Sequence, residues 1–182
     1  MLIILMLGTT VNLSAKDGVP FIHSFGELRV YYKDWLVVCA DKGDGECRMV
    51  NYVNKDSSQK TGFFPDSRLT LIPAQLGKAA SIDFFDKGAP SEVNGISIDV
   101  DGKAFSVQAS GYDTPEKNRV METYIVHDEV TLKEVVKLSK PARWLTFSYE
   151  GISGQVSKVR FSLRGFTKAL AFIKKQESKR GC

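Results

Sequence analysis

The sequence predicts a mostly β fold, an antiparallel β-sandwich of about ten short strands with two short helices, one of them C-terminal. Apolar and β-branched residues occur in short runs bounded by Gly, Pro, Asp and Asn, which is typical of strands joined by turns. In "ISIDVDGKAFSVQA" the dipeptide Asp101-Gly102, which favours a two-residue hairpin turn, separates two alternating segments. So many strands are typical of a sandwich or a barrel, and we expect the sandwich. The expected strands are 28–32, 35–39, 47–53, 69–72, 81–85, 95–100, 104–109, 120–126, 144–149 and 158–163.

The N-terminal end has the pattern of a secretory signal peptide. An apolar run over residues 2–7 is followed by small and polar residues, and the first charge is Lys16. The basic segment that normally precedes such a run is missing, which a start codon assigned too far downstream would explain; a buried N-terminal strand is the alternative. The run is far shorter than the roughly 20 residues of a membrane-spanning helix. We therefore expect a signal peptide at residues 1–15 and a single domain at residues 16–182.

Two segments have apolar residues at helical rather than alternating spacing. In "TLKEVVKLSKPARW" Thr131 precedes Glu134 by three residues, which is the spacing of a capping box, and Pro141 ends the pattern. In "GFTKALAFIKKQESKR" apolar residues recur every three or four positions, with the lysines mostly elsewhere. We expect both helices to pack on the β core. The expected helices are 131–139 and 167–178, and the polar stretches 54–62 and 111–119 are expected to be loops.

Two of the three cysteines, Cys39 and Cys47, flank the seven-residue segment "ADKGDGE" between strand-like runs. A hairpin with this loop would bring them opposite each other, at a separation that permits a disulfide. A zinc site would need four Cys or His ligands at spacings that this chain does not show, and redox dithiols more typically have two intervening residues. These residues favour a structural disulfide, with a redox-active pair and free thiols or a metal site as alternatives.

The segments "DWLVVC", "CRMVNYV" and, far downstream, "VRFSLRGFTKAL" resemble the bacterial invasion-associated locus B family. The resemblance is local and covers segments near both ends of the chain. In the middle of the chain only the order of the strands and one helix agrees with the family. It implies an exported, mostly β protein of the periplasm or outer membrane, with a role in host-cell entry or colonisation. It also implies a disulfide between Cys39 and Cys47 with Trp35 as its neighbour in the core, and it implies no catalytic residues.

Positive charge is concentrated near the C-terminus. The formal net charge is +4, but residues 164–182 contain six basic residues and one acidic residue, which leaves 19 basic and 20 acidic residues elsewhere. Such a segment is a candidate docking surface for anionic partners, among which nucleic acid is disfavoured by export. The alternative is a solvated helix face that complements the helix dipole. The candidate anion-binding residues are Lys168, Lys174, Lys175, Lys179 and Arg180.

Few residues suggest catalysis. The chain has two histidines, His23 and His127, and it has no Gly-x-Ser-x-Gly nucleophile motif and no glycine-rich phosphate loop. We expect both histidines to lie on the surface, and we expect no metal and no cofactor. Cys182 leaves an odd number of cysteines, so it could link two chains as a disulfide dimer or remain unpaired.

These observations together predict a non-enzymatic exported protein that interacts with an unidentified protein, envelope component or host-surface ligand. The expected location is the periplasm or the cell exterior, with association to the outer membrane as an option. The alternatives are an anion-binding module that uses the basic C-terminal segment and a periplasmic hydrolase of unknown substrate.

Overall fold

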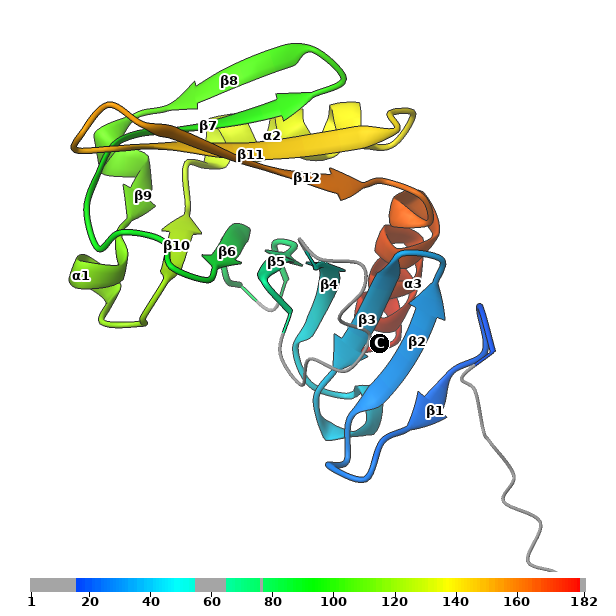
Figure 1. Cartoon of the computed structure of the whole chain (residues 1–182). Helices are drawn as coiled ribbons and strands as arrows, with labels where there is room; N and C mark the ends of the chain where they lie inside the picture. The colour runs from blue at the N-terminus through cyan, green and yellow to red at the C-terminus, as the bar shows by residue number, and fades with distance from the viewer. Residues whose placement is uncertain (1–15, 55–64, 76, 181–182) are drawn as a thin grey trace, which may run out of the picture.

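Two antiparallel β-sheets make up most of the structure, which is a computed structural model (Figure 1). It describes residues 16–54, 65–75 and 77–180. The larger sheet has the strand order β1-β2-β3-β4-β5-β6-β10-β9 and the smaller sheet the order β12-β11-β7-β8, so the predicted mostly β sandwich is confirmed. The strands of this part of the chain are β1 (Phe21–Ile22), β2 (Leu28–Tyr32), β3 (Trp35–Cys39), β4 (Cys47–Val53), β5 (Ser67–Ile72), β6 (Ser81–Asp86), β7 (Val93–Val100), β8 (Lys103–Val107), β9 (Tyr112–Asp113), β10 (Thr123–Val126), β11 (Trp144–Gly151) and β12 (Val156–Ser162).

The hairpin between β7 and β8 turns at the dipeptide that the sequence indicated. Asp101 and Gly102 both have positive φ angles, 47° and 92°, and Val100 pairs with Lys103 across the turn. Positive φ at both central residues is what a two-residue turn between twisted strands requires. From the middle of β7 onward every second residue is buried and the residues between them are half-buried, so one face of this strand lies against the core.

Several short elements were not predicted. The strands β2, β3 and β4 have the expected bounds, but β1 and β9, with two residues each, were missed. The stretch 111–119, expected to be a loop, contains the single-turn helix α1 (Pro115–Asn118). Thr114 caps this helix by accepting a hydrogen bond from the Lys117 amide at 3.4 Å, and Arg119 ends it with a φ of 58°. Short 3-10 turns occur at Asp41–Gly43 and Ala109–Gly111.

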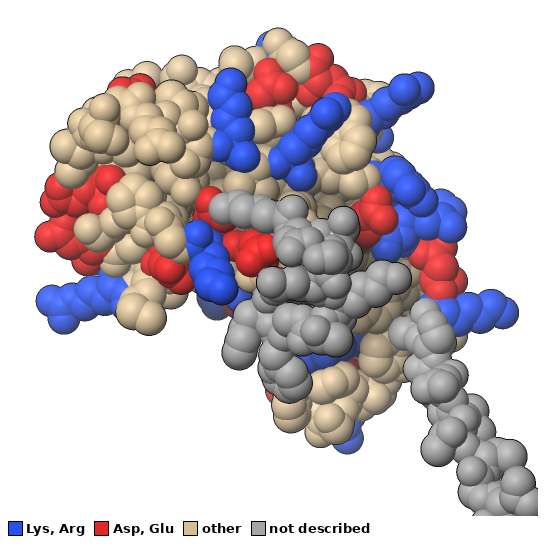
Figure 2. All heavy atoms as spheres, viewed as in Figure 1, with Lys and Arg blue, Asp and Glu red and all other residues tan. Residues whose placement is uncertain are grey.

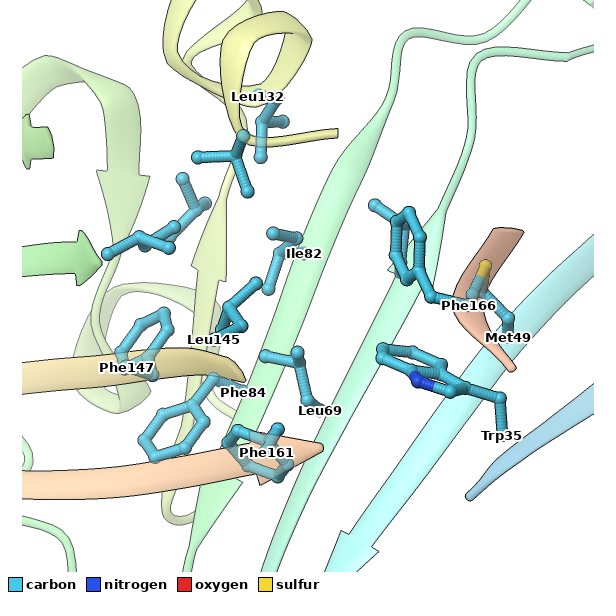
Figure 3. Close-up of a cluster of buried hydrophobic side chains, with 14 of the residues drawn as sticks. Trp35, Met49, Leu69, Ile82, Phe84, Leu132, Leu145, Phe147, Phe161 and Phe166 are labelled. Atoms are coloured by element: carbon cyan, nitrogen blue, oxygen red, sulfur yellow. The ribbon is translucent and has the colours of Figure 1, made fainter. Parts of the chain in front are cut away.

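Aromatic side chains fill the space between the sheets (Figure 3). Phe84 from β6 stacks on Phe147 from β11 with ring centroids 3.9 Å apart, and Phe161 from β12 meets Phe84 edge-on at 6.1 Å. Trp35 from β3 packs edge-on against Phe166 of the C-terminal helix at 5.2 Å. All five side chains are buried, so one continuous core runs from the space between the sheets to the C-terminal helix.

The helix α2 (Glu129–Ser139) begins earlier than expected, and a different residue caps it. The Asp128 carboxylate accepts hydrogen bonds from the amides of Val130 and Thr131, both at 3.1 Å. The prediction that Thr131 and Glu134 form the capping box is therefore wrong, because an equally good capping side chain stands three residues upstream.

The C-terminal helix α3 (Phe166–Arg180) stands beside β2, β3 and β4 (Figure 1) and is three residues longer than the expected 167–178. The residue before the helix is Gly165, whose φ is +91° and whose Cα lies so close to the Tyr32 carbonyl that a Cβ would overlap that group. Glycine is therefore needed there for two reasons, the left-handed backbone and the close approach. The helix residues buried against the core are Phe166, Ala169, Leu170 and Ile173.

Three expectations fall on residues outside the described parts of the chain. These are the signal peptide at residues 1–15, most of the loop expected at residues 54–62, and the state of Cys182. Among the described helices, none is long and apolar enough to cross a membrane.

Candidate functional site

The structure contains the disulfide that the sequence favours. Cys39 and Cys47 occupy paired positions on β3 and β4, with Cα atoms 4.0 Å apart and their sulfur atoms bonded. Both residues are fully buried, and no group of three or more His, Cys, Asp or Glu residues that could hold a metal occurs in the described chain. Because a redox-active pair must be accessible to its partner, burial favours a structural role. Trp35, on the same face of β3, donates a hydrogen bond to the Ser162 carbonyl at 3.0 Å.

A side-chain clamp holds the disulfide hairpin to the end of α3. The Gln75 amide bonds both backbone groups of Cys47, accepting from its N–H at 2.9 Å and donating to its carbonyl. The Arg180 guanidinium donates to Gln75 Oε1 at 3.2 Å and to the Gly45 carbonyl. This clamp could not be predicted from the sequence, because Arg180 is 105 positions from Gln75 and 135 positions from Gly45 along the chain.

Four of the five candidate anion-binding residues lie on the outer side of α3, and the fifth does not. Lys168, Lys174, Lys175 and Lys179 are exposed and form no ion pair with a described residue. Lys and Arg side chains gather on the side of the molecule that carries α3 (Figure 2). Arg180, in contrast, is only partly exposed and donates to the hairpin, so it is already occupied by protein acceptors.

Neither histidine lies in an arrangement that supports nucleophilic catalysis. His127 Nε2 is 3.7 Å from Asp113 Oδ2, and the pKa of Asp113 is lowered, chiefly by its hydrogen bond with Lys117. His23 accepts a hydrogen bond from the Phe25 amide at 3.3 Å and packs edge-on against the Phe25 ring. The four surface hollows described below include neither histidine in their linings. A nucleophile next to an imidazole, which a hydrolase would need, is therefore not formed by either histidine with the residues described.

A buried polar cluster joins the two sheets beside a hollow of about 510 Å³. The Asp86 carboxylate accepts hydrogen bonds from Ser67 Oγ at 2.7 Å and from the Tyr149 hydroxyl at 2.8 Å. Burial, with Asp86 nearby, raises the pKa of Tyr149 to about 12, and burial also raises the pKa of Tyr124, whose hydroxyl donates to the Pro90 carbonyl. Both phenols thus stay protonated near neutral pH and act as hydrogen-bond donors rather than as bases.

Exposed apolar side chains stand at the loop end of the molecule, where the loops 87–92, 119–122 and 152–155 meet. Met121 is 84% exposed and Ile152 is 67% exposed. Met121 borders a hollow of about 550 Å³ and Ile152 borders the 510 Å³ hollow, and both hollows include Ser91 in their linings. The described residues do not show what would cover these side chains.

The outer surface of the smaller sheet carries a hollow with a mixed lining of charged, hydroxyl and aromatic side chains. Trp144 is 38% exposed on this surface, whereas Trp35 is fully buried. The Arg160 guanidinium lies over the Trp144 ring, 4.1 Å from its centroid. A hollow of about 540 Å³ here adjoins a second one of about 350 Å³ over the same strands. We call this surface the Trp144 face; its residues are Ser97, Asp99, Asp101, Trp144, Thr146, Ser148, Lys158 and Arg160.

Sequence reasoning placed Trp144 only at the start of a strand and did not identify this face. A signal was present, because Leu145, Phe147 and Tyr149 alternate with Trp144 and are buried, so the tryptophan shares the outward side with polar residues. The positions of the charged residues on β7 and β12 could not be predicted in this way, because the order of the strands is needed to place them beside β11.

Comparison with known proteins adds one finding. No family model matches the sequence, and no curated protein matches it. Among solved structures, the crystal structure of invasion associated protein B from Bartonella henselae aligns with a TM-score of 0.57, covering 82% of this chain and 98% of that one. The two chains share a fold. They are 13% identical, so the likeness concerns the fold alone.

Proposed function

We propose that the chain is an exported, non-enzymatic interaction protein of the bacterial envelope or of a host surface, with a contribution to host-cell invasion or colonisation. The observation that carries this proposal is the fold shared with invasion associated protein B over 98% of that chain. In this proposal residues 1–15 are the signal peptide and residues 16–182 are the exported domain.

The disulfide supports the proposed compartment. Disulfides form and persist in oxidising environments such as the periplasm and the cell exterior, and they are rare in the cytosol. Cys39 and Cys47 are both fully buried within the paired strands β3 and β4, so this bond is part of the packed structure rather than an exposed reactive pair.

The surface features support binding rather than catalysis. Several large apolar or aromatic side chains are exposed, among them Phe25, Met121 and Trp144, and aromatic residues and methionine are enriched in interfaces. The tyrosines with raised pKa values, Tyr124 and Tyr149, serve as donors inside the fold.

Two measurements test the proposal. Thiol titration of protein purified without reductant from the periplasmic fraction should find Cys39 and Cys47 oxidised, and the same chain lacking residues 1–15 should remain in the cytosol. The purified protein should then bind intact host cells or isolated envelopes in a saturable manner, and a heat-unfolded sample serves as control. Retention of the full-length chain in the cytosol with free thiols, or no saturable binding to either surface, would refute the proposal.

A second candidate is an anion-binding module on α3, and it is favoured by one observation. Lys168, Lys175 and Lys179 are spaced by seven and four residues, so they project from one side of the helix, and all three are exposed. Replacing these three by glutamine should release the protein from a heparin column at a lower salt concentration. A matched triple variant of the exposed lysines elsewhere, Lys87, Lys133 and Lys140, should elute close to the wild type; equal shifts in both variants would show only the effect of net charge.

A further inference from the structure

We propose that the Trp144 face is a binding site for a carboxylate-bearing sugar chain. The proposal does not depend on the compartment or on the function proposed above, because it rests on the side chains of β7, β11 and β12 alone. The surface offers three things that such a ligand needs: an exposed aromatic ring, positive charges that form no ion pair with a described residue, and hydroxyl and carboxylate acceptors between and beside them.

The strand register places these groups in two rows across the sheet. In the first row Asp99 of β7 pairs with Thr146 of β11, which pairs with Arg160 of β12. Neighbouring strands lie about 4.8 Å apart, so the carboxylate and the guanidinium are rooted about 10 Å apart, on either side of a hydroxyl. Asp99 and Arg160 form no ion pair with each other or with another described residue.

The second row continues the same pattern towards the smaller hollow. Ser97 of β7 pairs with Ser148 of β11, which pairs with Lys158 of β12. The two serines line the hollow of about 350 Å³, and Lys158 lines the hollow of about 540 Å³ with the residues of the first row. Lys and Arg stand beside Asp and Glu over the smaller sheet, at the top of the view (Figure 2). A trough of this kind suits an extended ligand of more than one ring.

Hydrogen-bonding capacity at the face is only partly used by the protein. Both carboxylate oxygens of Asp101 already accept hydrogen bonds, from the backbone amides of Arg143 and Trp144 at 2.8 and 3.0 Å. These bonds fix the start of β11. Asp99 Oδ1 accepts the Gly102 amide at 3.0 Å, while Oδ2 accepts no hydrogen bond from a described residue. That free oxygen is a natural acceptor for a sugar hydroxyl.

The two cations are free to bind a carboxylate. Across the described residues, neither the Arg160 guanidinium nor the Lys158 ammonium donates a hydrogen bond to a protein group. Arg160 is held over the Trp144 ring at 4.1 Å, so its position is fixed before a ligand arrives. A guanidinium matches a carboxylate through two parallel hydrogen bonds, and the part of the indole that Arg160 leaves exposed offers an apolar surface to the C–H groups of the sugar ring.

The mixture of charges argues for this ligand over a uniform polyanion. A nucleic acid or a chain of carboxylates without hydroxyls would bring negative charge next to Asp99 and Asp101, which line the same hollow. A uronate-containing chain alternates an isolated carboxylate with several hydroxyls. Its carboxylate would face Arg160 and Lys158, and its hydroxyls would face Asp99 and Thr146.

Tryptophan fluorescence gives a direct test. The chain has two tryptophans, and Trp35 is fully buried, so quenching by acrylamide reports chiefly on Trp144. We expect a hyaluronan hexasaccharide to lower the quenching constant saturably, by about twofold, as it covers the exposed ring. A chitin hexasaccharide, which is neutral, and a hexaglutamate peptide, which has no hydroxyls, should each bind at least about tenfold more weakly.

Two variants locate the site. Arg160→Gln should weaken hexasaccharide binding about tenfold, whereas Lys133→Gln, which removes the same charge from an exposed position on α2, should leave it unchanged. Trp144→Ala, followed by calorimetry, should weaken binding as well. The proposal is overturned if the hexasaccharide gives no protection up to about 10 mM, a concentration at which even weak sites fill. It is also overturned if either comparison ligand binds equally well, or if Lys133→Gln weakens binding and Arg160→Gln does not.

Discussion

Replacing Tyr149 by phenylalanine removes one hydroxyl from the buried contact between the two sheets and leaves the ring in place. The hydroxyl donates to Asp86 Oδ2 at 2.8 Å, where Asp86 is 2% exposed. A hydrogen bond to a buried charged group contributes about 1.5–3 kcal/mol, and the phenyl ring leaves no cavity. Because Ser67 still donates to the same carboxylate, we expect the free energy of unfolding to fall by about 2 kcal/mol.

The same contact makes the free energy of unfolding depend on pH in the alkaline range. The pKa of Tyr149 is raised to about 12 in the folded protein, first by burial and also by Asp86, whereas the unfolded chain has the ordinary value of about 10. The unfolded state therefore loses this proton first as the pH rises. The stabilisation is fully present below about pH 10 and is lost as the pH rises through about 12. The advantage of the wild type over Tyr149→Phe should shrink across this window.

Urea denaturation followed by near-ultraviolet circular dichroism measures both effects. The wild type, Tyr149→Phe and the control Tyr52→Phe would be compared at about pH 8 and about pH 11. Tyr52 is 49% exposed and its hydroxyl forms no hydrogen bond with a described residue, so its variant should match the wild type at the lower pH. A loss below about 0.5 kcal/mol for Tyr149→Phe at pH 8, or a loss that is the same at both pH values, would refute the reasoning.

Three further changes probe other parts of the fold by the same denaturation assay. Replacing Cys39 and Cys47 together by serine should lower the free energy of unfolding by roughly 2–3 kcal/mol, and an unchanged value would contradict the structural role of the disulfide. Gly165→Ala should prevent α3 from docking, at a cost of several kcal/mol, while Gly102→Ala, which also has positive φ but has open space around its Cα, should cost only about 1 kcal/mol. Asp128→Ala should cost about 1 kcal/mol by removing the cap of α2, and Asp128→Asn should restore most of it.

The strands whose ends are marked by turn residues could be predicted from the sequence. Leu28–Tyr32, Trp35–Cys39 and Cys47–Val53 were predicted with their correct bounds because glycine-rich or charged turns separate β-prone runs. The two-residue strands β1 and β9 could not be predicted in this way, since they exist only through pairing with their neighbours. The one-turn helix α1 was readable in principle from the Thr114-Pro115 pair, a capping residue followed by a proline suited to the first turn.

The candidate sites depend on long-range arrangement to different degrees. The disulfide is local, because its partners are eight positions apart in the sequence, so the hairpin pattern sufficed to favour it. The Trp144 face needs β7, β11 and β12 to be adjacent, and the sequence alone does not establish that Asp99 and Arg160 flank Thr146. The clustering of positive charge predicted that Arg180 faces solvent. In the structure its guanidinium instead donates hydrogen bonds to the Gly45 carbonyl and to the Gln75 side chain.

The long stretch of chain between α3 and the strands β2, β3 and β4 that it packs against constrains when this part of the protein can fold. The helix supplies Phe166 to the packing around Trp35, and the indole of Trp35 donates to a carbonyl 127 residues downstream. Trp35 is synthesised long before Ser162 and Phe166, and contacts between residues so far apart in the sequence form slowly. During synthesis the packing around Trp35 therefore stays incomplete until the residues of α3 have emerged.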